Sequence, residues 1–532
     1  MRFLFFLKNN QRLLDFFFIA LVLCIYGELS LWLGQDAHGD VWNYHLYNGW
    51  SYLNNRLDWD LAPAGAHSFL NPYLDVLFFK LVTTLEGSVY CFVIGAVHGL
   101  IVVPVLLIVR HLLSKHYLLS YPVSALCCFG SVFYIGCLGL STHDDLITIF
   151  VLFSFYFLIR FLESYKLYFA LFSAIILGLS VGLKLTAATY AIAFCSLILI
   201  FVTGGVGRKI KISFYYGCTL LIGAIISTGL WCYRLYVDYD NPLFPFYNNI
   251  FKSPLASLDG AATQAMYFFQ QKGLEHIFYP FFFADNPQRV ASSTSEFIIY
   301  LPVFTIIACW TALCVFYSKK NRSIDDKKIL FCSVFLVTSY VIWQFIFGVY
   351  RYFLPTDILL PLFLFLFINY SISAREDFLK PCRKLFVLIF LCALVCYQVA
   401  GGIPGWGRGA ILSPYYSGNV PDELKKADVI FLGSYPSAWL VPVIEPQGHV
   451  ICVGDVFLNF YSQEYKSRYF EIPQRKSVFI IFDTHLQFDK SRVEERLAFY
   501  KLKIDWSSKK TFETRLSSYH RPQDYYRLVL MN

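Results

Sequence analysis

Long apolar runs, separated by short polar stretches, fill the first three quarters of the chain. A membrane-spanning helix needs about 20 mostly apolar residues, and this criterion predicts about eleven spans along the sequence. The predicted spans are residues 13–33, 88–110, 118–139, 145–161, 167–183, 187–203, 213–235, 296–317, 329–348, 353–370 and 385–401. A shorter and more polar segment at 71–85 predicts a helix that lies at the membrane interface or re-enters the membrane.

The pattern changes after residue 402, where short apolar runs alternate with helix-like segments. The runs ADVIFLGS, GHVICVGDVF and KSVFIIFD end in turn-forming or acidic residues, which is typical of strands. Segment 491–501 is typical of an intervening helix, so the alternation predicts a small α/β domain. The expected parts are a helical transmembrane domain at residues 1–404, with loops at about 34–85 and 236–295, and an α/β domain at 405–532.

Composition supports a polytopic α-helical membrane protein. Of the 532 residues, 57% are hydrophobic and 15% are charged, whereas soluble proteins are about 25% charged. The net charge of +8 does not indicate nucleic-acid binding, because most basic residues lie in short loops between apolar runs. Most of the 15 cysteines lie within apolar runs, and no CxxC pair occurs, which argues against a structural zinc site.

The basic residues also predict an orientation in the membrane. Lys and Arg favour cytoplasmic loops, and here they cluster in every second connection, beginning with the N-terminal segment. We therefore expect the N-terminus in the cytoplasm. With an odd number of crossings, the loops at 34–70 and 236–295 and the C-terminal α/β domain are expected on the outer side.

The stretch GQDAHGDVWNYHLYNGW, from Gly34 to Trp50, places two acids where the chain is expected to leave the membrane. Ionisable groups at this position are costly, which makes them functional candidates. We expect burial to raise the pKa of Asp40 and to let its carboxylate accept a proton from a hydroxyl. Asp36 is the second candidate for this catalytic role. The alternative is that either acid only caps the helix that begins near Val41.

A second acidic site, STHDDL, opens the span predicted at 145–161. Its His143, Asp144 and Asp145 exceed what a helix cap requires, although a hydroxyl cap followed by acids is also a common way to start a helix. The roles open to these groups are to orient a substrate hydroxyl, to bind a divalent ion or to support the base. The sequence does not identify a metal.

Basic residues at the predicted outer ends of helices form a third group. Arg351, flanked by Tyr350 and Tyr352 in FGVYRYFLPTD, can hold a phosphate through paired hydrogen bonds. A lone arginine here would instead extend to the lipid headgroups, but Lys184 supplies a second cation within an apolar stretch. We therefore expect a phosphate site that contains Arg351, Lys184 and Tyr352. Arg234 is a weaker member, because a single basic residue at a helix end needs no ligand.

Four strings and the order of the acids along the chain carry a resemblance to a known superfamily. The strings are GDVWNYHLYNGWSYLNNRLDWDLAPAGAHSFLNPYLD, GLSVGLKLTAATYA, DNPLFPFYNNIF and YRYFLP. Together with an acid after the first span and a soluble C-terminal part, they resemble the GT-C membrane glycosyltransferases, over about residues 10 to 400. The resemblance matches Asp40, or its competitor Asp36, to the aspartate of the first loop, and Asp144 or Asp145 to the later acid. The first loop lacks the adjacent acidic pair of some protein-mannosylating members, so no acceptor class is implied.

The resemblance implies an inverting sugar transfer from a polyprenyl-phosphate donor to a hydroxyl of a glycan or glycolipid. The reaction is expected at the outer face of a bacterial cytoplasmic membrane, with the lipid bilayer as a partner and no nucleic acid. No cofactor is required, because a phosphate monoester is a competent leaving group, although the acidic site has room for a divalent cation. The alternatives are a polysaccharide polymerase or ligase that uses diphosphate-linked glycans, and a flippase or transporter of lipid-linked sugars, with polar groups near the membrane midplane.

Overall fold

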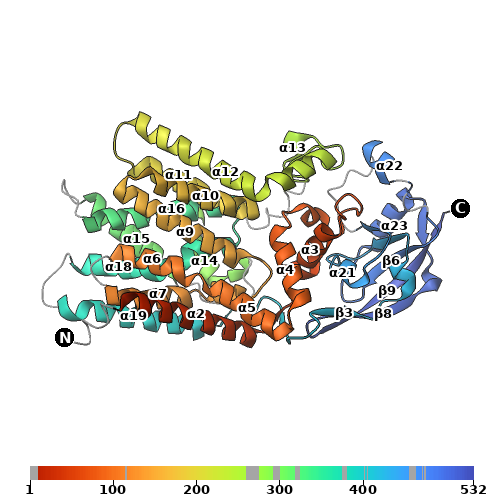
Figure 1. The fold of residues 1–532 in the computed structure, drawn as a ribbon, viewed down its shortest axis with the longest axis horizontal. Helices are drawn as coiled ribbons and strands as arrows, with labels where there is room; N and C mark the ends of the chain where they lie inside the picture. The colour runs from red at the N-terminus through yellow and green to blue at the C-terminus, as the bar shows by residue number, and fades with distance from the viewer. Residues whose placement is uncertain are drawn as a thin grey trace.

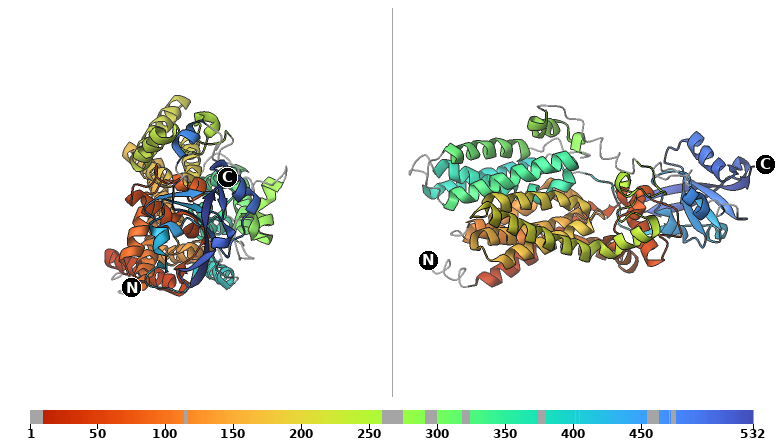
Figure 2. Two further views of the ribbon diagram at one scale, coloured as in Figure 1. Left: turned by 90° about the vertical axis from the view of Figure 1, so that its right-hand side faces the viewer. Right: turned by 90° about the horizontal axis from the view of Figure 1, so that it is seen from above.

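The computed structural model describes residues 10–113, 117–258, 275–290, 300–317, 324–373, 380–400, 402–403, 405–453, 463–469, 471 and 475–531. This part of the chain forms a long helical bundle with a β-sheet region at one end (Figure 1). The two further views in Figure 2 agree with this arrangement. We call the end of the bundle that faces the sheet region the sheet end.

Apolar helices run along the bundle, and each predicted span corresponds to one helix or to a pair of helices. The helices are α2 (Gln11–Leu33), α5 (Gly87–Gly99), α6 (Val102–Leu113), α7 (Ser120–Gly130), α8 (Val132–Cys137), α9 (Asp144–Ser164), α10 (Leu167–Leu183), α11 (Ala188–Phe201), α12 (Val206–Tyr239), α15 (Tyr300–Tyr317), α16 (Ile324–Ile346), α17 (Leu354–Asp357), α18 (Leu360–Ser373) and α19 (Lys380–Ala400). Short helices α13 (Asn248–Phe251) and α14 (Glu275–Asp285) follow α12.

Several spans are shorter than the roughly 20 residues that a membrane crossing needs. Within the described residues, five helices are long and apolar enough to cross a membrane, and a pair bent by 47°, at residues 350–357 and 360–370, makes a sixth if counted as one. The remaining spans correspond to apolar helices of 10–17 residues. In the span predicted at 118–139 the break has a local cause, because the Ser131 hydroxyl accepts a hydrogen bond from the Tyr134 amide and caps a new helix, α8.

Helix α4 (Tyr73–Thr84) runs across the sheet end of the bundle, crosswise to the long helices (Figure 1). The helix predicted at 71–85 is therefore present. Its buried side chains are Asp75, Phe78 and Val82, and this spacing places them on one face of the helix. A carboxylate thus lies on the buried face of an otherwise apolar helix.

The C-terminal part is a mixed α/β structure, as predicted. Its sheet has the order β3-β8-β9-β6-β4-β5, with β7 also paired to β9. The three predicted runs form β4, β5 and β6, which pair in parallel and are almost entirely buried. The strands are β3 (Tyr416–Gly418), β4 (Val429–Leu432), β5 (His449–Cys452), β6 (Val478–Asp483), β7 (Leu502–Ile504), β8 (Lys510–Leu516) and β9 (Tyr519–Leu530), and the helices are α20 (Asp422–Lys425), α21 (Leu440–Ile444), α22 (Gln463–Tyr469) and α23 (Lys490–Phe499).

The loop after α2 packs into the sheet region and shares its core. This first loop contains β1 (Gln35–Asp36), the π-helix η1 (Val41–His45), α3 (Leu46–Leu53) and η2 (Gly65–Phe69). Strand β1 pairs with β2 (Arg408–Gly409), just after the last helix of the bundle. Leu61 extends the edge of the sheet, because its amide donates to the Val450 carbonyl at 2.8 Å and its carbonyl accepts from the Cys452 amide at 3.1 Å.

Candidate active site

Four charged side chains meet at the sheet end of the bundle, and we call them the charged centre. They are Asp40, Asp144, Lys184 and Arg351. Asp40 directly precedes η1, Asp144 is the first residue of α9, Lys184 directly follows α10, and Arg351 lies in the 3₁₀ turn η7 (Tyr350–Phe353) that opens the bent helix pair. Four separate segments therefore supply one residue each, and all four residues were site candidates in the sequence.

Arg351 joins the two acids of the charged centre. Its Nη1 atom lies 2.9 Å from Asp40 Oδ2, and its Nε atom lies 3.5 Å from Asp144 Oδ2. Lys184 binds the other oxygen of Asp144 at 2.5 Å and donates to the Thr142 carbonyl at 2.6 Å. Asp144 is thus held between two cations.

The charged centre keeps unused hydrogen-bonding capacity. Asp40 Oδ2, Asp144 Oδ2 and Arg351 Nε are buried, and among the described residues none makes a hydrogen bond of good geometry in addition to its ionic contact. Buried polar atoms in this state are costly, and a bound ligand can satisfy them. The Asp40 side chain is 21% exposed whereas that of Asp144 is 3% exposed, so a ligand reaches Asp40 more readily.

Aromatic rings line the cationic side of the charged centre. The Tyr352 ring centre lies 5.4 Å from Lys184 Nζ and 5.5 Å from Arg351 Cζ. The Trp406 ring centre lies 5.9 Å from Arg351 Cζ. Cation–π contacts of this kind favour the charged form and orient the guanidinium. Tyr352 therefore lies beside both proposed phosphate-binding cations.

The predicted rise in the pKa of Asp40 is wrong. Burial acts to raise this pKa, but the Arg351 guanidinium, together with His38 and His45, holds it well below its ordinary value. The carboxylate is therefore ionised at neutral pH. The Asp40 side chain also makes no capping hydrogen bond to η1, so helix capping does not explain this residue.

Asp36 has a different environment from Asp40. It is buried, and its two oxygens accept hydrogen bonds from the backbone amides of His38 and Ser141, both at 2.7 Å. These bonds tie the first loop to the turn before α9. Asp36 therefore holds together the segments that carry Asp40 and Asp144.

The three consecutive residues of the second acidic site turn to three different partners. Asp144 belongs to the charged centre, whereas the buried Asp145 meets His98, with 2.9 Å between Oδ2 and Nδ1. His143 turns to Asp75 on α4, with 2.9 Å between Nε2 and Oδ1. The three residues therefore do not converge on one point, and the expected divalent cation at this acidic site stays a prediction.

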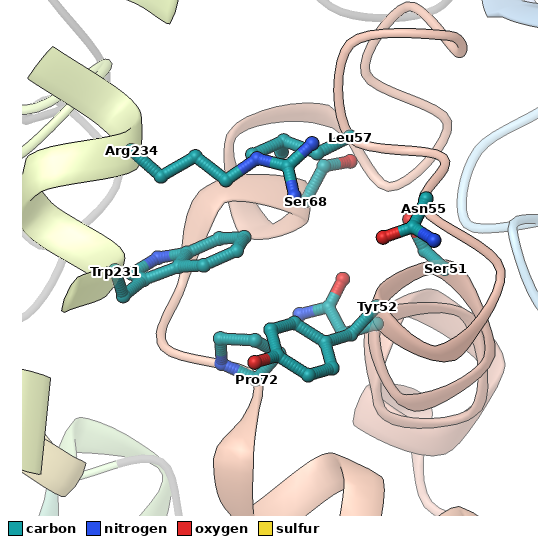
Figure 3. A pocket seen from close by; sticks show the side chains of 9 residues that line it. Ser51, Tyr52, Asn55, Leu57, Ser68, Pro72, Trp231 and Arg234 are labelled. Atoms are coloured by element: carbon teal, nitrogen blue, oxygen red, sulfur yellow. The ribbon is translucent and has the colours of Figure 1, made fainter. Parts of the chain in front are cut away.

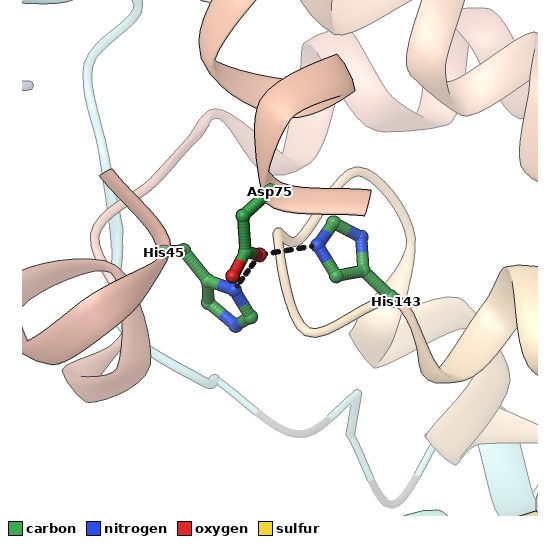
Figure 4. A group of neighbouring side chains, drawn as sticks. All are labelled: His45, Asp75 and His143. Atoms are coloured by element: carbon green, nitrogen blue, oxygen red, sulfur yellow. Dashed lines mark hydrogen bonds and ion pairs between the residues drawn. The ribbon is translucent and has the colours of Figure 1, made fainter. Parts of the chain in front are cut away.

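Asp75 lies between two histidines (Figure 4). His45 Nδ1 lies 2.6 Å and His143 Nε2 lies 2.9 Å from the same Asp75 oxygen. Burial lowers the pKa of His143 to about 4, although Asp75 acts in the opposite direction. Burial alone would raise the pKa of Asp75, but His45 and His143 bring it below its ordinary value. These three residues could hold a metal ion, because their ligand atoms lie within 4.8 Å of one another.

Arg234 lies outside the charged centre. Its guanidinium pairs with Asp58 at 3.1 Å and with Asp238 at 3.4 Å. It lines a small pocket with Trp231, Tyr52 and other residues of the first loop and α12 (Figure 3). None of the charged-centre residues lines this pocket, so Arg234 has no contact that places it with Arg351 and Lys184.

Three further polar residues near the charged centre had not been singled out from the sequence. They are Asp75, His98 and Arg408, whose guanidinium donates to the carbonyls of Gly136 at 2.7 Å and Leu138 at 2.6 Å. Asp75 carried a usable signal, because it is the acid in the apolar pattern NPYLDVLFFKL. His98 and Arg408 act through partners that are distant in sequence, and no local pattern identifies them.

No family model and no curated protein matches the chain. A solved structure is similar: the crystal structure of ArnT from Cupriavidus metallidurans bound to undecaprenyl phosphate. The likeness has a TM-score of 0.50 at 9% sequence identity, and it covers 96% of this chain and 97% of that one. At this identity the likeness concerns the fold. The helical bundle with its C-terminal sheet region thus shares its fold with this ArnT structure, and the expected GT-C-like architecture is confirmed at the level of the fold.

Proposed function

We propose that the chain is a glycosyltransferase that moves a sugar from a polyprenyl-phosphate donor to an acceptor hydroxyl, with inversion at the anomeric carbon. The observation that carries the proposal is the charged centre, in which two acids and two cations meet at one end of an apolar bundle. A lipid-linked phosphate needs cations beside an apolar surface. The similar fold of ArnT, whose structure contains undecaprenyl phosphate, supports this donor class.

The proposed reaction is a single displacement. The acceptor oxygen forms a bond to the anomeric carbon while the bond from this carbon to the phosphate oxygen breaks. Asp40 accepts the hydroxyl proton, and the bonding electron pair leaves with the phosphate. Arg351 and Lys184 stabilise the negative charge that develops on the leaving phosphate.

Burial supports Asp40 as the base in preference to Asp36 and Asp144. Asp36 has both oxygens engaged with backbone amides and is 1% exposed. Asp144 is almost fully buried, and each of its oxygens faces a cation. Asp40 faces Arg351 with its Oδ2 atom and is the more exposed acid. We assign its other oxygen, Oδ1, to the acceptor hydroxyl.

Donor binding would also prepare Asp40 for its role. A phosphate beside Arg351 would share the guanidinium that now binds Asp40, since one guanidinium offers five N–H donors. Because the Arg351 guanidinium would then interact less with Asp40, the pKa of the Asp40 carboxylate would rise and it would become a stronger base. Asp144 would keep Arg351 and Lys184 in place during this exchange.

The basic loops support an outer, extracytoplasmic location for the charged centre, in a bacterial cytoplasmic membrane with the N-terminus inside. The acceptor would be a glycan or glycolipid. Charged residues that gather at one end of the bundle favour an enzyme over a transporter, which needs polar groups near the membrane midplane.

The test is a turnover assay with purified protein in lipid nanodiscs. The donors are a polyprenyl-phosphate sugar and the matching polyprenyl-diphosphate sugar, both labelled in the sugar, and a bacterial membrane extract supplies the acceptors. We expect transfer from the monophosphate donor and a loss of about 10²- to 10⁴-fold in Asp40→Asn. Asp58→Asn, which alters an exposed acid beside Arg234, is the matched control. Transfer from the diphosphate donor alone, or full turnover by folded Asp40→Asn, would contradict the proposal.

A further inference from the structure

The cluster His45, Asp75 and His143 lies beside the charged centre but has no part in the proposed reaction. Each residue comes from a different segment: His45 ends η1, Asp75 lies on the buried face of α4, and His143 directly precedes α9. His45 and Asp75 are buried, and His143 is nearly so. Figure 4 shows both rings turned toward the same carboxylate. Three elements of the sheet end therefore meet at one buried point.

The donor atoms of this cluster are those that a zinc ion prefers. Two imidazole nitrogens and one carboxylate oxygen form the ligand set of many zinc sites that keep a fourth position open for water or substrate. Two ligand atoms of a tetrahedral zinc ion are about 3.3 Å apart. The two nitrogens are 2.6 and 2.9 Å from the Asp75 oxygen, so reaching this separation from the oxygen requires outward shifts of about 0.7 and about 0.4 Å.

The hydrogen bonds in the cluster are compatible with exchange for a metal. When a neutral imidazole donates to the Asp75 carboxylate, the nitrogen that faces the carboxylate carries the ring's proton. An ion would require these protons on His45 Nε2 and His143 Nδ1, and this is a change of tautomer without loss of a proton. His45 Nε2 is buried and has no hydrogen-bond partner within the described residues, so no neighbouring group fixes the present tautomer of this ring.

We propose that His45, Asp75 and His143 bind a divalent cation of the zinc class, with one coordination position open. The ion would join the first loop, the interfacial helix α4 and the start of α9, and would thereby fix the segments that carry Asp40 and Asp144. These ligands are 30 and 68 residues apart along the chain, which is why no short spacing pattern reveals them. The proposal does not depend on the glycosyltransferase reaction.

The control for this site is the other buried histidine–aspartate pair of the same region, His98 and Asp145. It resembles the cluster in burial and in its 2.9 Å contact, but no second histidine contacts this acid within the described residues. A variant of His98 therefore removes a buried imidazole without removing a proposed ligand.

The experiment uses the full chain, purified in detergent, stripped with a chelator and then titrated with Zn²⁺ or with Mg²⁺. We expect about one bound zinc per chain by elemental analysis, a higher melting temperature with Zn²⁺ than with Mg²⁺, and at least tenfold weaker zinc binding in His45→Ala, Asp75→Ala and His143→Ala. His98→Ala should bind zinc as the wild type does. X-ray absorption of the zinc-loaded wild type should show two imidazole ligands and no sulfur, and this readout does not require a variant to fold.

Three results would overturn the proposal. The wild type could fail to bind zinc in stoichiometric amount, which would leave a hydrogen-bonded cluster only. All three ligand variants could bind zinc with unchanged affinity, or the absorption spectrum could show sulfur ligands. None of these results bears on sugar transfer, so the two proposals can fail separately.

Discussion

Two arginine–aspartate contacts at the sheet end differ in how completely their atoms are used. Arg56 donates to both oxygens of Asp60, at 2.7 and 3.0 Å, and also to the carbonyls of Pro446 and Gly448. Asp60 accepts two more bonds, from the Val450 amide at 2.9 Å and from the hydroxyl of Tyr47 at 3.2 Å. Every polar group of this pair thus has a partner within the protein.

The contact between Arg351 and Asp40 is less deeply buried on the side of the acid, and it is not saturated. In the part of the chain that the structure describes, Arg351 Nε and Asp40 Oδ2 have no hydrogen bond of good geometry, and the guanidinium is shared with Asp144 at 3.5 Å. In a saturated pair neither partner can contact a ligand without losing a hydrogen bond within the protein, so the pair serves the fold. An unsaturated pair can exchange a protein contact for a substrate contact. Unused hydrogen-bonding capacity and a more accessible acid, more than charge, distinguish the candidate site from a structural ion pair.

Arg351→Gln gives the largest expected effect. Loss of the cation removes stabilisation of the leaving phosphate, so we expect turnover to fall about 10²- to 10³-fold. Arg351→Lys keeps the charge but loses the paired hydrogen bonds, and its turnover should lie between those of the wild type and Arg351→Gln. The measurement is kcat/KM with the polyprenyl-phosphate donor. Equal turnover in all three proteins would remove Arg351 from the site.

Arg56→Gln should act on stability instead of turnover. Asp60 would remain buried without its cation, and this costs about 3–5 kcal/mol. Denaturant titration of the purified protein measures the loss in the free energy of unfolding. The double variant Arg56→Met with Asp60→Leu should recover much of this loss, because two apolar side chains can replace a buried pair. Molecules that remain folded should keep their kcat.

The pH dependence of turnover offers a smaller but sharper contrast. Arg351, His38 and His45 hold the pKa of Asp40 below its ordinary value, against the effect of burial. The base therefore stays ionised, and the wild type should lose no turnover through Asp40 as the pH falls to about 5. In Arg351→Gln burial is less opposed, the pKa rises, and turnover should fall at a higher pH than in the wild type. Coincident acid limbs in the two kcat/KM profiles would contradict this explanation.

Arg234→Gln should have the smallest effect. The Arg234 side chain is 36% exposed, and that of its partner Asp58 is 64% exposed. Exposed pairs contribute about 0–1 kcal/mol, so the free energy of unfolding should change by no more than this amount. Turnover should stay within about twofold of the wild type. A loss as large as that of Arg351→Gln would return Arg234 to the donor site.

The sequence was most informative where one physical requirement dominates. The need for a continuous apolar segment located the helices of the bundle, and alternation of short runs located strands β4, β5 and β6. The cost of a charge at a membrane boundary singled out Asp40, Asp144, Lys184 and Arg351, which the structure brings together. The same argument made Arg234 a site candidate, because the cost of burying a charge does not indicate which charged side chain pairs with another at the surface.

Features that depend on distant contacts could not be predicted. The direction of the Asp40 pKa shift is one case, since burial was foreseen but the 2.9 Å contact with Arg351 was not. The choice between Asp36 and Asp40 is another, because it depends on which carboxylate meets the Ser141 amide. Asp75 is a third case, because the apolar pattern of its segment indicates membrane depth but not which face of the helix the carboxylate occupies.

The pairing of β1 with β2 has a consequence for how the protein is made. Arg408 donates to the carbonyl of Gly34, which lies 374 residues earlier in the chain. During translation the first loop is complete early, yet its strand partner leaves the ribosome only after the last helix of the bundle. The helices that flank this loop are therefore expected to insert into the membrane before β2 has been synthesised. The site is therefore assembled late in biogenesis. A nascent chain that stalls before β2 contains all four residues of the charged centre but lacks the pairing of β1 with β2.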